Sequence, residues 1–238
     1  MPPFTLPPDY PRIRRVHSFD ELLTTPLADG VNALCWERTL TGDFAEVTAR
    51  LGLVADDDIA ALDESRLRAL SLGAAGRIAV DHMLGDLQRL RDHGLAPELN
   101  CIRAYPRDGD REVVRTDVYS FHADSAPVAT ATWLCTYHGA PSEGLRNDEA
   151  QRRVDLPSTR AELLRQFGGA DDETFREHLA ENCYDLHYAP LPQARPFSFG
   201  VGNLWRIAVD YPGSPVPPCV HRAPATAAGD SARLLLIS

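Results

Sequence analysis

The sequence changes character near Pro97, and this change restricts the fold more than any other feature of the chain. Upstream, apolar residues recur mostly at helical spacing, whereas three downstream segments, 99–105, 112–124 and 128–138, are rich in β-branched and aromatic residues. Turn residues such as those at 107–110 separate these segments, as in antiparallel hairpins. A helical first part followed by strands predicts a mainly β chain, a sandwich or jelly roll with attached helices.

The N-terminal residues are expected to form an extended arm. Residues 1–16 contain five prolines, which exclude a regular helix and favour an extended segment lying on the surface. Ser18 and Glu21 then have the spacing of a capping box, in which each side chain accepts a hydrogen bond from the other's backbone. A short helix is therefore expected to follow the arm.

The remainder of the first part is expected to support the core with helices. Segment 31–37 has the composition of a strand, and apolar residues in 44–51 fall on one helical face. Segment 56–93 begins with three aspartates, which suit a helix N-terminus, and Gly94 is a natural end. Two glycines inside that segment are expected to divide it into two helices: Gly73 and Gly76.

The second part is expected to hold the core and one helical insertion. Segment 158–182 has helical character, with Ser158 or Thr159 as its cap. Strand-like sequence returns in three later segments: 197–209, 217–224 and 231–238. We therefore expect a single domain over 1–238, in which 1–98 is the arm and helical support and 99–238 is a jelly-roll core.

Charge and cysteine content argue against several classes of protein. A formal net charge of −10 works against a nucleic-acid partner. The five cysteines are scattered, without a C-x-x-C pair, and are expected to be reduced core thiols. The N-terminus lacks the apolar run of a signal peptide, and the sequence contains no apolar run long enough for a membrane helix. These features predict a cytoplasmic protein without a membrane partner.

The candidate chemistry centres on His122 and Asp124. Residues two apart on a strand point the same way, so this pair can converge on a metal ion. With 8 histidines and 34 acidic residues, roughly one His-x-Asp/Glu triplet is expected by chance, so the pair alone carries little information. A distant third ligand, His221, would complete the two-histidine, one-carboxylate set that non-haem iron(II) oxygenases use.

An arginine on the last expected strand accompanies the candidate ligands. A hairpin centred near Ala227 or Ala228 would set Arg233 opposite His221 or its neighbour, about 5 Å away between Cβ atoms. A guanidinium binds a carboxylate in bidentate fashion, so Arg233 is expected to anchor a molecule that chelates the metal. Two hydroxyl groups on segment 128–138, those of Thr136 and Tyr137, could bond the same carboxylate, although core packing explains them equally well.

The order H-x-D, then His in an HRAP context, then Arg resembles the double-stranded β-helix superfamily of iron(II)- and 2-oxoglutarate-dependent oxygenases. The stretch SFHADSAPVATATWLCTYHGAPSEGL also resembles the bacterial DUF1826 family, with the similarity covering about 99–238. The resemblance implies iron(II) at the three ligands, 2-oxoglutarate at Arg233 and consumption of O2. It also implies a hydroxylase rather than a halogenase, since halogenases of this superfamily lack the carboxylate that Asp124 supplies.

The expected substrate is a small molecule, such as an amino acid or natural-product intermediate. Side chains that could contact it are Arg103, Arg115, Arg146, Arg152, Arg153 and Trp205, although each arginine also fits a solvated surface. Two further histidines, His138 and His187, are alternative metal ligands. The rival functions are a cupin-like metalloenzyme that does not use 2-oxoglutarate and a non-catalytic jelly-roll binding protein. A serine or cysteine hydrolase is disfavoured, because no nucleophile motif occurs.

Overall fold

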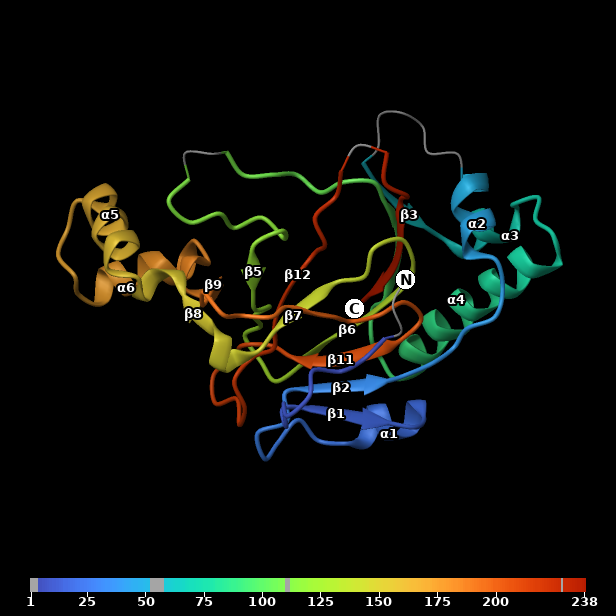
Figure 1. Cartoon of the computed structure of the whole chain (residues 1–238), viewed down its shortest axis with the longest axis horizontal. Coiled ribbons are helices and arrows are strands. Elements are labelled where there is room, and N and C mark those ends of the chain that lie inside the picture. Colours follow the sequence, from blue (N-terminus) through green and yellow to red (C-terminus); the bar gives the residue numbers. More distant parts are fainter. Residues whose placement is uncertain (1–3, 52–57, 110–111, 228) are drawn as a thin grey trace.

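The computed structural model describes residues 4–51, 58–109, 112–227 and 229–238 (Figure 1). Within them the chain is a mixed α/β protein built on two sheets, one of them curled into a half-barrel, with about 30% helix and 24% strand. The mainly β composition expected from the sequence is therefore wrong. One reason is that segment 112–124 contributes only the two-residue strand Phe121–His122, the rest of it being turns and irregular chain.

The first sheet has seven strands and joins the N-terminal part of the chain to the C-terminal part. Their spatial order is β1 (Ile13–Val16), β2 (Ala33–Trp36), β11 (Leu204–Ala208), β6 (Ala131–His138), β13 (Arg233–Ile237), β4 (Glu98–Ile102) and β3 (Ile59–Leu62). Only the β1–β2 pair is parallel. The expected strands at 31–37, 99–105, 128–138 and 231–238 are thus confirmed, and all belong to this sheet.

The second sheet has six shorter strands. Their spatial order is β10 (Phe197–Ser198), β7 (Glu143–Leu145), β12 (Val220–Arg222), β5 (Phe121–His122), β9 (His187–Pro190) and β8 (Ala150–Arg152). All of its pairings are antiparallel. The expected strand at 217–224 is confirmed, and segment 197–209 divides between β10 here and β11 in the first sheet.

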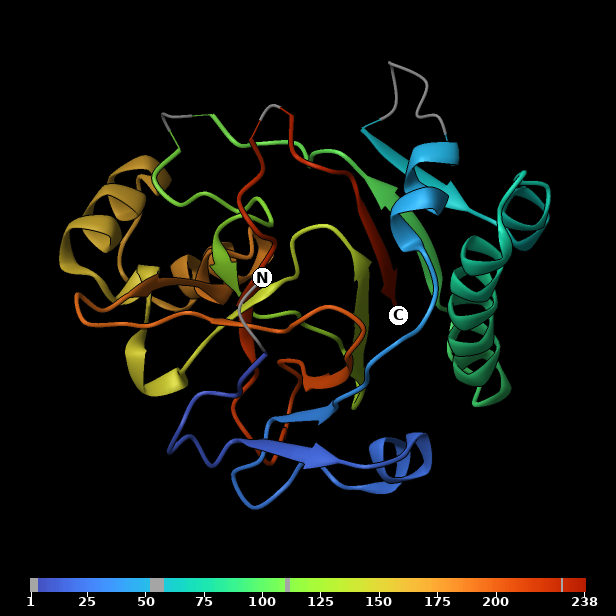
Figure 2. The same cartoon turned by 45° about the vertical axis from the view of Figure 1, so that its right-hand side comes forward.

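The α-helices are α1 (Phe19–Thr24), α2 (Phe44–Leu51), α3 (Glu64–Arg68), α4 (Ala74–Asp92), α5 (Pro157–Phe167) and α6 (Glu173–Glu181). Helices α5 and α6 lie at one end of the molecule and α2 to α4 at the other, whereas α1 lies beside β1 and β2 (Figures 1 and 2). The expected helices at 44–51 and within 158–182 are confirmed. None of the helices in the described ranges is long and apolar enough to cross a bilayer, and the cytoplasmic location stays a prediction.

Local signals explain where several helices begin and end. The Ser18 side chain accepts a hydrogen bond from the backbone of Glu21, as expected, but Glu21 accepts one from His17 rather than from Ser18. Helix α4 starts after Gly73 and ends one residue before His93, with Gly94 at a positive φ of 76°. Helix α5 starts one residue before the expected caps, because Pro157 occupies its first position.

The expected helix over 56–93 is wrong in its first part. Asp56 and Asp57 lie outside the described residues, and Ile59–Leu62 form strand β3 instead. This strand pairs with β4 along its whole length, from Ile59 opposite Ile102 to Leu62 opposite Leu99. Backbone pairing with a neighbour that is distant in the sequence therefore overrides the local acidic signal.

The first sheet separates two apolar clusters. On its outer face, Trp133, Tyr137 and Leu236 pack against α1, α2 and α4 in the larger cluster. On its inner face, Leu134 and Trp205 pack with aromatic residues of the second sheet and the loop that follows it, in a smaller cluster. The two sheets therefore face each other across the inner face of the first, and alternate residues of β6 point to opposite sides.

Four of the five cysteines are buried and all five are free. The exception to the expected core position is Cys183, which is exposed and has a positive φ of 56°. Burial raises the pKa of Cys101 to about 11 and that of Cys135 to about 12. These thiols therefore stay protonated at neutral pH and serve as small apolar core residues.

Candidate metal centre

The three expected metal ligands meet at one point between the two sheets. One ligand atom from each of His122, Asp124 and His221 lies within 4.8 Å of the others. The Nε2 atoms of His122 and His221 each lie 3.7 Å from one carboxylate oxygen of Asp124. Adjacent positions around an ion with ligands at about 2.1 Å are about 3.0 Å apart, so each histidine–carboxylate distance exceeds that spacing by less than about 1 Å.

Strand pairing sets the two histidines side by side. His122 of β5 is directly opposite His221 of β12, and their ring centroids are 4.6 Å apart. Directly opposite residues share a face of the sheet, so both imidazoles project to the same side. A one-residue slip in the β5–β12 register would turn one ring to the other face.

Both imidazoles are oriented in the same way by the backbone. Nδ1 of His122 donates a hydrogen bond of 2.8 Å to the Ser120 carbonyl, and Nδ1 of His221 donates one of 3.3 Å to the Cys219 carbonyl. The other nitrogen of each ring, Nε2, is the atom that lies near Asp124. Such a hydrogen bond behind a histidine ligand is what orients it for a metal ion.

Asp124 lies where the chain leaves the second sheet for the first. Its backbone carbonyl accepts a hydrogen bond from Asp210, which follows β11. Thr132 on the inner face of β6 donates a hydrogen bond of 2.5 Å to the Asp124 carboxylate. The carboxylate is therefore held between the two sheets, with one oxygen facing each histidine.

The electrostatics of the site favour the charge states that bind a cation. Burial, together with His221, lowers the pKa of His122 to about 4, so its imidazole is neutral at neutral pH. Burial by itself raises the pKa of Asp124, but His221, the Thr132 hydrogen bond and His122 outweigh it and hold that pKa below its usual value. Two imidazoles, that of His122 held in its neutral form, and one carboxylate are a donor set for a divalent metal ion.

Arg233 is buried on the inner face of the first sheet without a carboxylate partner. Only 1% of its surface is exposed. Its guanidinium donates to three hydroxyl groups, those of Tyr105, Thr136 and Ser142, at 3.1 to 3.3 Å, and its Nε has no hydrogen-bond partner. Burial lowers its pKa. Among the described residues no acidic group pairs with this cation, so its charge is not balanced.

One strand connects Arg233 to the metal ligands. Thr132 and Thr136 both lie on the inner face of β6, and the first bonds Asp124 while the second bonds Arg233. Four residues of strand span about 13 Å at the backbone. The guanidinium and the candidate metal position therefore lie along the same strand, on the same side of the first sheet.

Two expectations about this region are wrong. Arg233 does not pair across a hairpin with His221, because β12 and β13 belong to different sheets and Arg233 is opposite Ile102; Ala228, one of the two expected centres of the hairpin, lies outside the described residues. Tyr137 does not share a site with Thr136, because neighbours on a strand point to opposite faces. Its hydroxyl donates to the buried Asp86 on the outer side.

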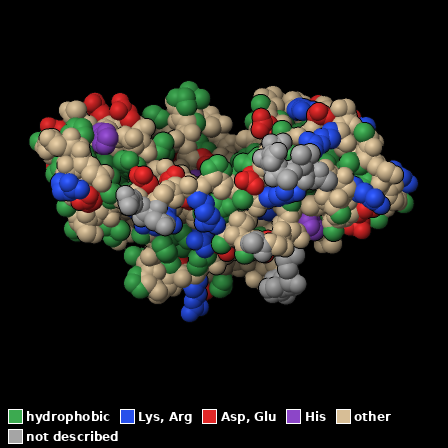
Figure 3. All heavy atoms as spheres, turned by 90° about the horizontal axis from the view of Figure 1, so that it is seen from above, with side chains coloured by type: hydrophobic (Ala, Val, Ile, Leu, Met, Phe, Trp, Pro, Cys, Tyr) green, Lys and Arg blue, Asp and Glu red, His purple; other side chains and the backbone are tan. Residues whose placement is uncertain are grey.

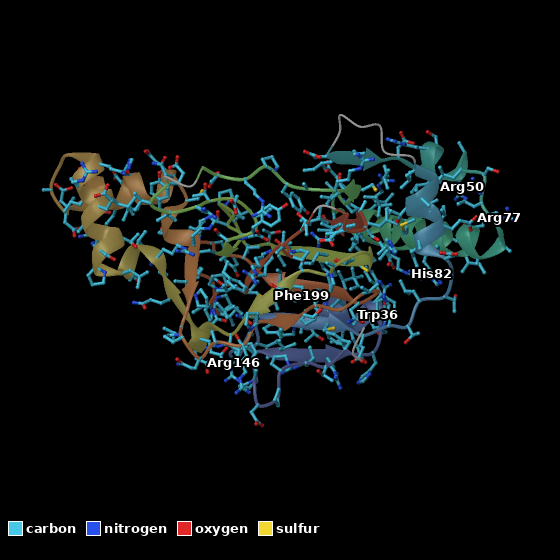
Figure 4. The ribbon with its side chains drawn as sticks, turned by 45° about the horizontal axis from the view of Figure 1, so that its top comes forward. Trp36, Arg50, Arg77, His82, Arg146 and Phe199 are labelled. Atoms are coloured by element: carbon cyan, nitrogen blue, oxygen red, sulfur yellow. The ribbon has the colours of Figure 1, made fainter. Side chains whose placement is uncertain are left out.

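The expected substrate contacts are dispersed. Arg103 and Arg115 are exposed. Arg146 pairs with Asp148 and stacks on Tyr10 of the N-terminal arm, and in Figure 4 it lies near the lower edge of the molecule. The surface seen in Figure 3 has acidic and basic side chains interspersed. Exposure or an existing ion pair therefore accounts for these arginines without a ligand.

Trp205 is separated from the candidate metal centre by one aromatic ring, that of Phe199. It is 1% exposed and stacks on Phe199 with ring centroids 4.3 Å apart, and Phe199 in turn stacks on His221 at 6.3 Å. Figure 4 places Phe199 among the central strands. Trp205 is therefore a core residue that supports the wall behind His221.

Neither alternative histidine belongs to the metal group among the described residues. His138 lies at the end of β6, and burial lowers its pKa. His187 is directly opposite His122 on β9, and their ring centroids are 5.8 Å apart, so it lies next to the centre without joining it.

Sequence reasoning missed the residues that hold the ligands and the arginine in place. Thr132, Ser142 and Tyr105 were not expected to take part. For Thr132 the signal was available: it shares the parity of Thr136 on the same strand, and alternation puts both on one face. Ser142 lies in a loop, and Tyr105, expected in strand 99–105, lies beyond the end of β4 at Ile102, so alternation along a strand indicates the direction of neither side chain.

Comparisons with protein-family models, with curated proteins and with solved structures give no match to this chain. The family resemblance noted in the sequence therefore stays an expectation. The triad of His122, Asp124 and His221 is a possible site for a metal ion on its geometry alone.

Proposed function

We propose that this protein is an iron(II)- and 2-oxoglutarate-dependent oxygenase that hydroxylates a small molecule. One observation carries the proposal. A two-histidine, one-carboxylate triad lies on the same side of the first sheet as Arg233, a buried arginine with no acidic partner among the described residues. A metal ion bound by the triad would account for the first feature, and an organic anion paired with Arg233 would account for the second.

The strand order supports a double-stranded β-helix as the fold. From β4 to β13, leaving out β8 and β9, successive strands lie in the first sheet, the second, the first, the second, the second, the first, the second and the first. Such alternation between two facing sheets is what a jelly roll requires. The N-terminal strands and β3 extend the first sheet, and β8 and β9 extend the second.

In this proposal each residue of the centre has a defined task. The two histidines and Asp124 hold iron(II) and leave three positions for other ligands. Arg233 binds the far carboxylate of 2-oxoglutarate, with Thr136 and Ser142 orienting its guanidinium. Iron(II), 2-oxoglutarate and O2 together replace a C–H bond of the substrate by C–OH, and 2-oxoglutarate leaves as succinate and CO2.

The span between the two features favours a dicarboxylic acid over a simple anion. A single oxyanion cannot reach both Arg233 and a metal ion at the triad, because Thr132 and Thr136 separate them along β6. A five-carbon diacid that chelates the metal at one end can present its other carboxylate to the arginine. A cupin-like enzyme that uses no cosubstrate has no need of this buried cation.

Anaerobic titration tests the proposal. We expect 2-oxoglutarate, added to the protein with iron(II), to produce the weak visible charge-transfer band of a keto acid chelated to iron. The band should be absent in His221→Ala. It should require at least about tenfold more 2-oxoglutarate in Arg233→Met, since a charge-assisted hydrogen bond is lost.

Arg146→Met is the matched control, because it removes the same charge from an arginine paired at the surface. A titration in which Arg233→Met behaves like the wild type would show that Arg233 does not bind 2-oxoglutarate. Absence of the band in the wild type, with iron(II) bound, would favour a metalloenzyme without this cosubstrate. Absence of iron(II) binding would favour a non-catalytic binding protein.

A further inference from the structure

A row of three imidazoles crosses the second sheet. His221 is opposite His122, and His122 is opposite His187, so the three rings lie on the same face. His187 is 4% exposed, and its buried Nδ1 has no hydrogen-bond partner. A buried polar atom without a partner costs free energy, which indicates a ligand that the protein alone does not supply.

Arg153 lies near the His187 end of this row. The β8–β9 pairing ends with Arg152 opposite Tyr188, and Arg153 follows as the first residue of the short 3-10 helix Arg153–Asp155. Arg153 lies near His187, because its charge helps to lower the pKa of that imidazole. The Nε of Arg153 is buried and lacks a hydrogen-bond partner, and no acidic side chain of the described residues forms an ion pair with it. Its neighbour Arg152, in contrast, pairs with Asp155 and Asp185.

The charges around this pair favour an anion. Burial and the nearby Arg115 both lower the pKa of Arg153. The carboxylates that act on His187 are those of Asp108 and Asp117. Both already accept hydrogen bonds from backbone N–H groups of their own loop, Asp108 from Thr116 and Asp117 from residues that follow it.

We propose that Arg153 and His187 bind an anionic group of the substrate, a carboxylate or a phosphate, beside the triad. The anion site itself does not depend on the proposed function. Only the statement that the anion is part of a substrate rests on it. Two strand spacings, about 10 Å, separate β5, which carries His122, from β8, which Arg153 follows. The anionic group therefore lies several bonds away from the carbon that reacts.

Nuclear magnetic resonance of the metal-free full-length protein tests the anion site directly. The probes are hexanoate, hexyl phosphate and the neutral hexan-1-ol, and the readout is the ring resonance of His187, assigned by its absence in His187→Gln. We expect at least one of the two anions to shift that resonance to saturation, and hexan-1-ol to leave it unchanged. The tighter of the two anions identifies the headgroup.

Substitutions at two adjacent arginines distinguish a specific anion site from nonspecific attraction between anions and positive charge. Arg153→Met should raise the dissociation constant of the better anion at least about tenfold, and Arg153→Lys should recover part of the loss. Arg152→Met should titrate like the wild type. Equal binding of hexan-1-ol, an unchanged constant in Arg153→Met, or an equal loss in Arg152→Met would each overturn the assignment.

The outcome of this test does not depend on the outcome of the iron titration. Anion binding at Arg153 without a 2-oxoglutarate band would support the anion site and contradict the proposed oxygenase activity. A normal band without any shift of the His187 resonance would support the oxygenase activity and contradict the proposal of an anionic substrate.

Discussion

Replacing Arg233 by methionine should make the metal-free protein more stable while weakening cosubstrate binding. The arginine is 1% exposed and bonds only hydroxyl groups, so its burial cost is not offset by an acidic partner. Replacing buried ionic groups by apolar residues of similar size has been stabilising by about 1–4 kcal/mol. That range is already net of the polar interactions lost with the ionic group, which here are three long hydrogen bonds. We expect a net gain in its lower part, about 1–2 kcal/mol.

Urea denaturation of the metal-free wild type and of Arg233→Met measures this difference. A gain of 1 kcal/mol corresponds to a rise of about 2–4 °C in the melting temperature for a chain of this size. With iron(II) and 2-oxoglutarate at about 100 times the dissociation constant, the wild type should gain about 2.7 kcal/mol and the variant far less. A loss of 2 kcal/mol or more in the metal-free variant would refute the reasoning, because it would mean that Arg233 is a structural cation with its charge balanced inside the protein.

Two further substitutions test the two faces of β6. Thr132→Val removes the hydrogen bond to Asp124 and should lower iron(II) affinity about 10- to 100-fold, whereas Thr130→Val, on the exposed approach to the strand, should leave it unchanged; equal effects in a metal titration would show that Asp124 does not depend on Thr132. Tyr137→Phe removes a buried hydrogen bond to Asp86 and should lower the free energy of unfolding by about 1–2 kcal/mol without changing 2-oxoglutarate affinity; a changed affinity would contradict its placement on the outer face.

The three candidate metal ligands could be predicted from the sequence, in part because of strand geometry. Residues two apart point the same way, which places His122 with Asp124, although β5 ends at His122 and Asp124 lies just beyond it. That His221 would join the other two ligands was inferred from its residue type and its position later in the chain. In the structure, the pairing of β5 with β12 brings it beside His122. Local rules sufficed for each ligand, whereas their meeting depends on pairing between distant segments.

The position of Arg233 could not be predicted in the same way. A short link between two strands favours a hairpin, yet the chain after β12 crosses to the other sheet and β13 pairs with β4 and β6. The choice between a hairpin and a crossover depends on which edges are free once the other strands are in place. The sequence near 223–232 contains no information about those edges. The same non-local pairing explains why Ile59–Leu62 is a strand.

The placement of His221 and Arg233 on opposite sheets has a mechanical consequence. A small molecule that contacts both residues bridges the two sheets, so separating them requires its release. Backbone amides of β12 and β13 then exchange with solvent through a shared opening event, and saturation with such a molecule slows both together. A ligand confined to one sheet would protect the amides of that sheet alone.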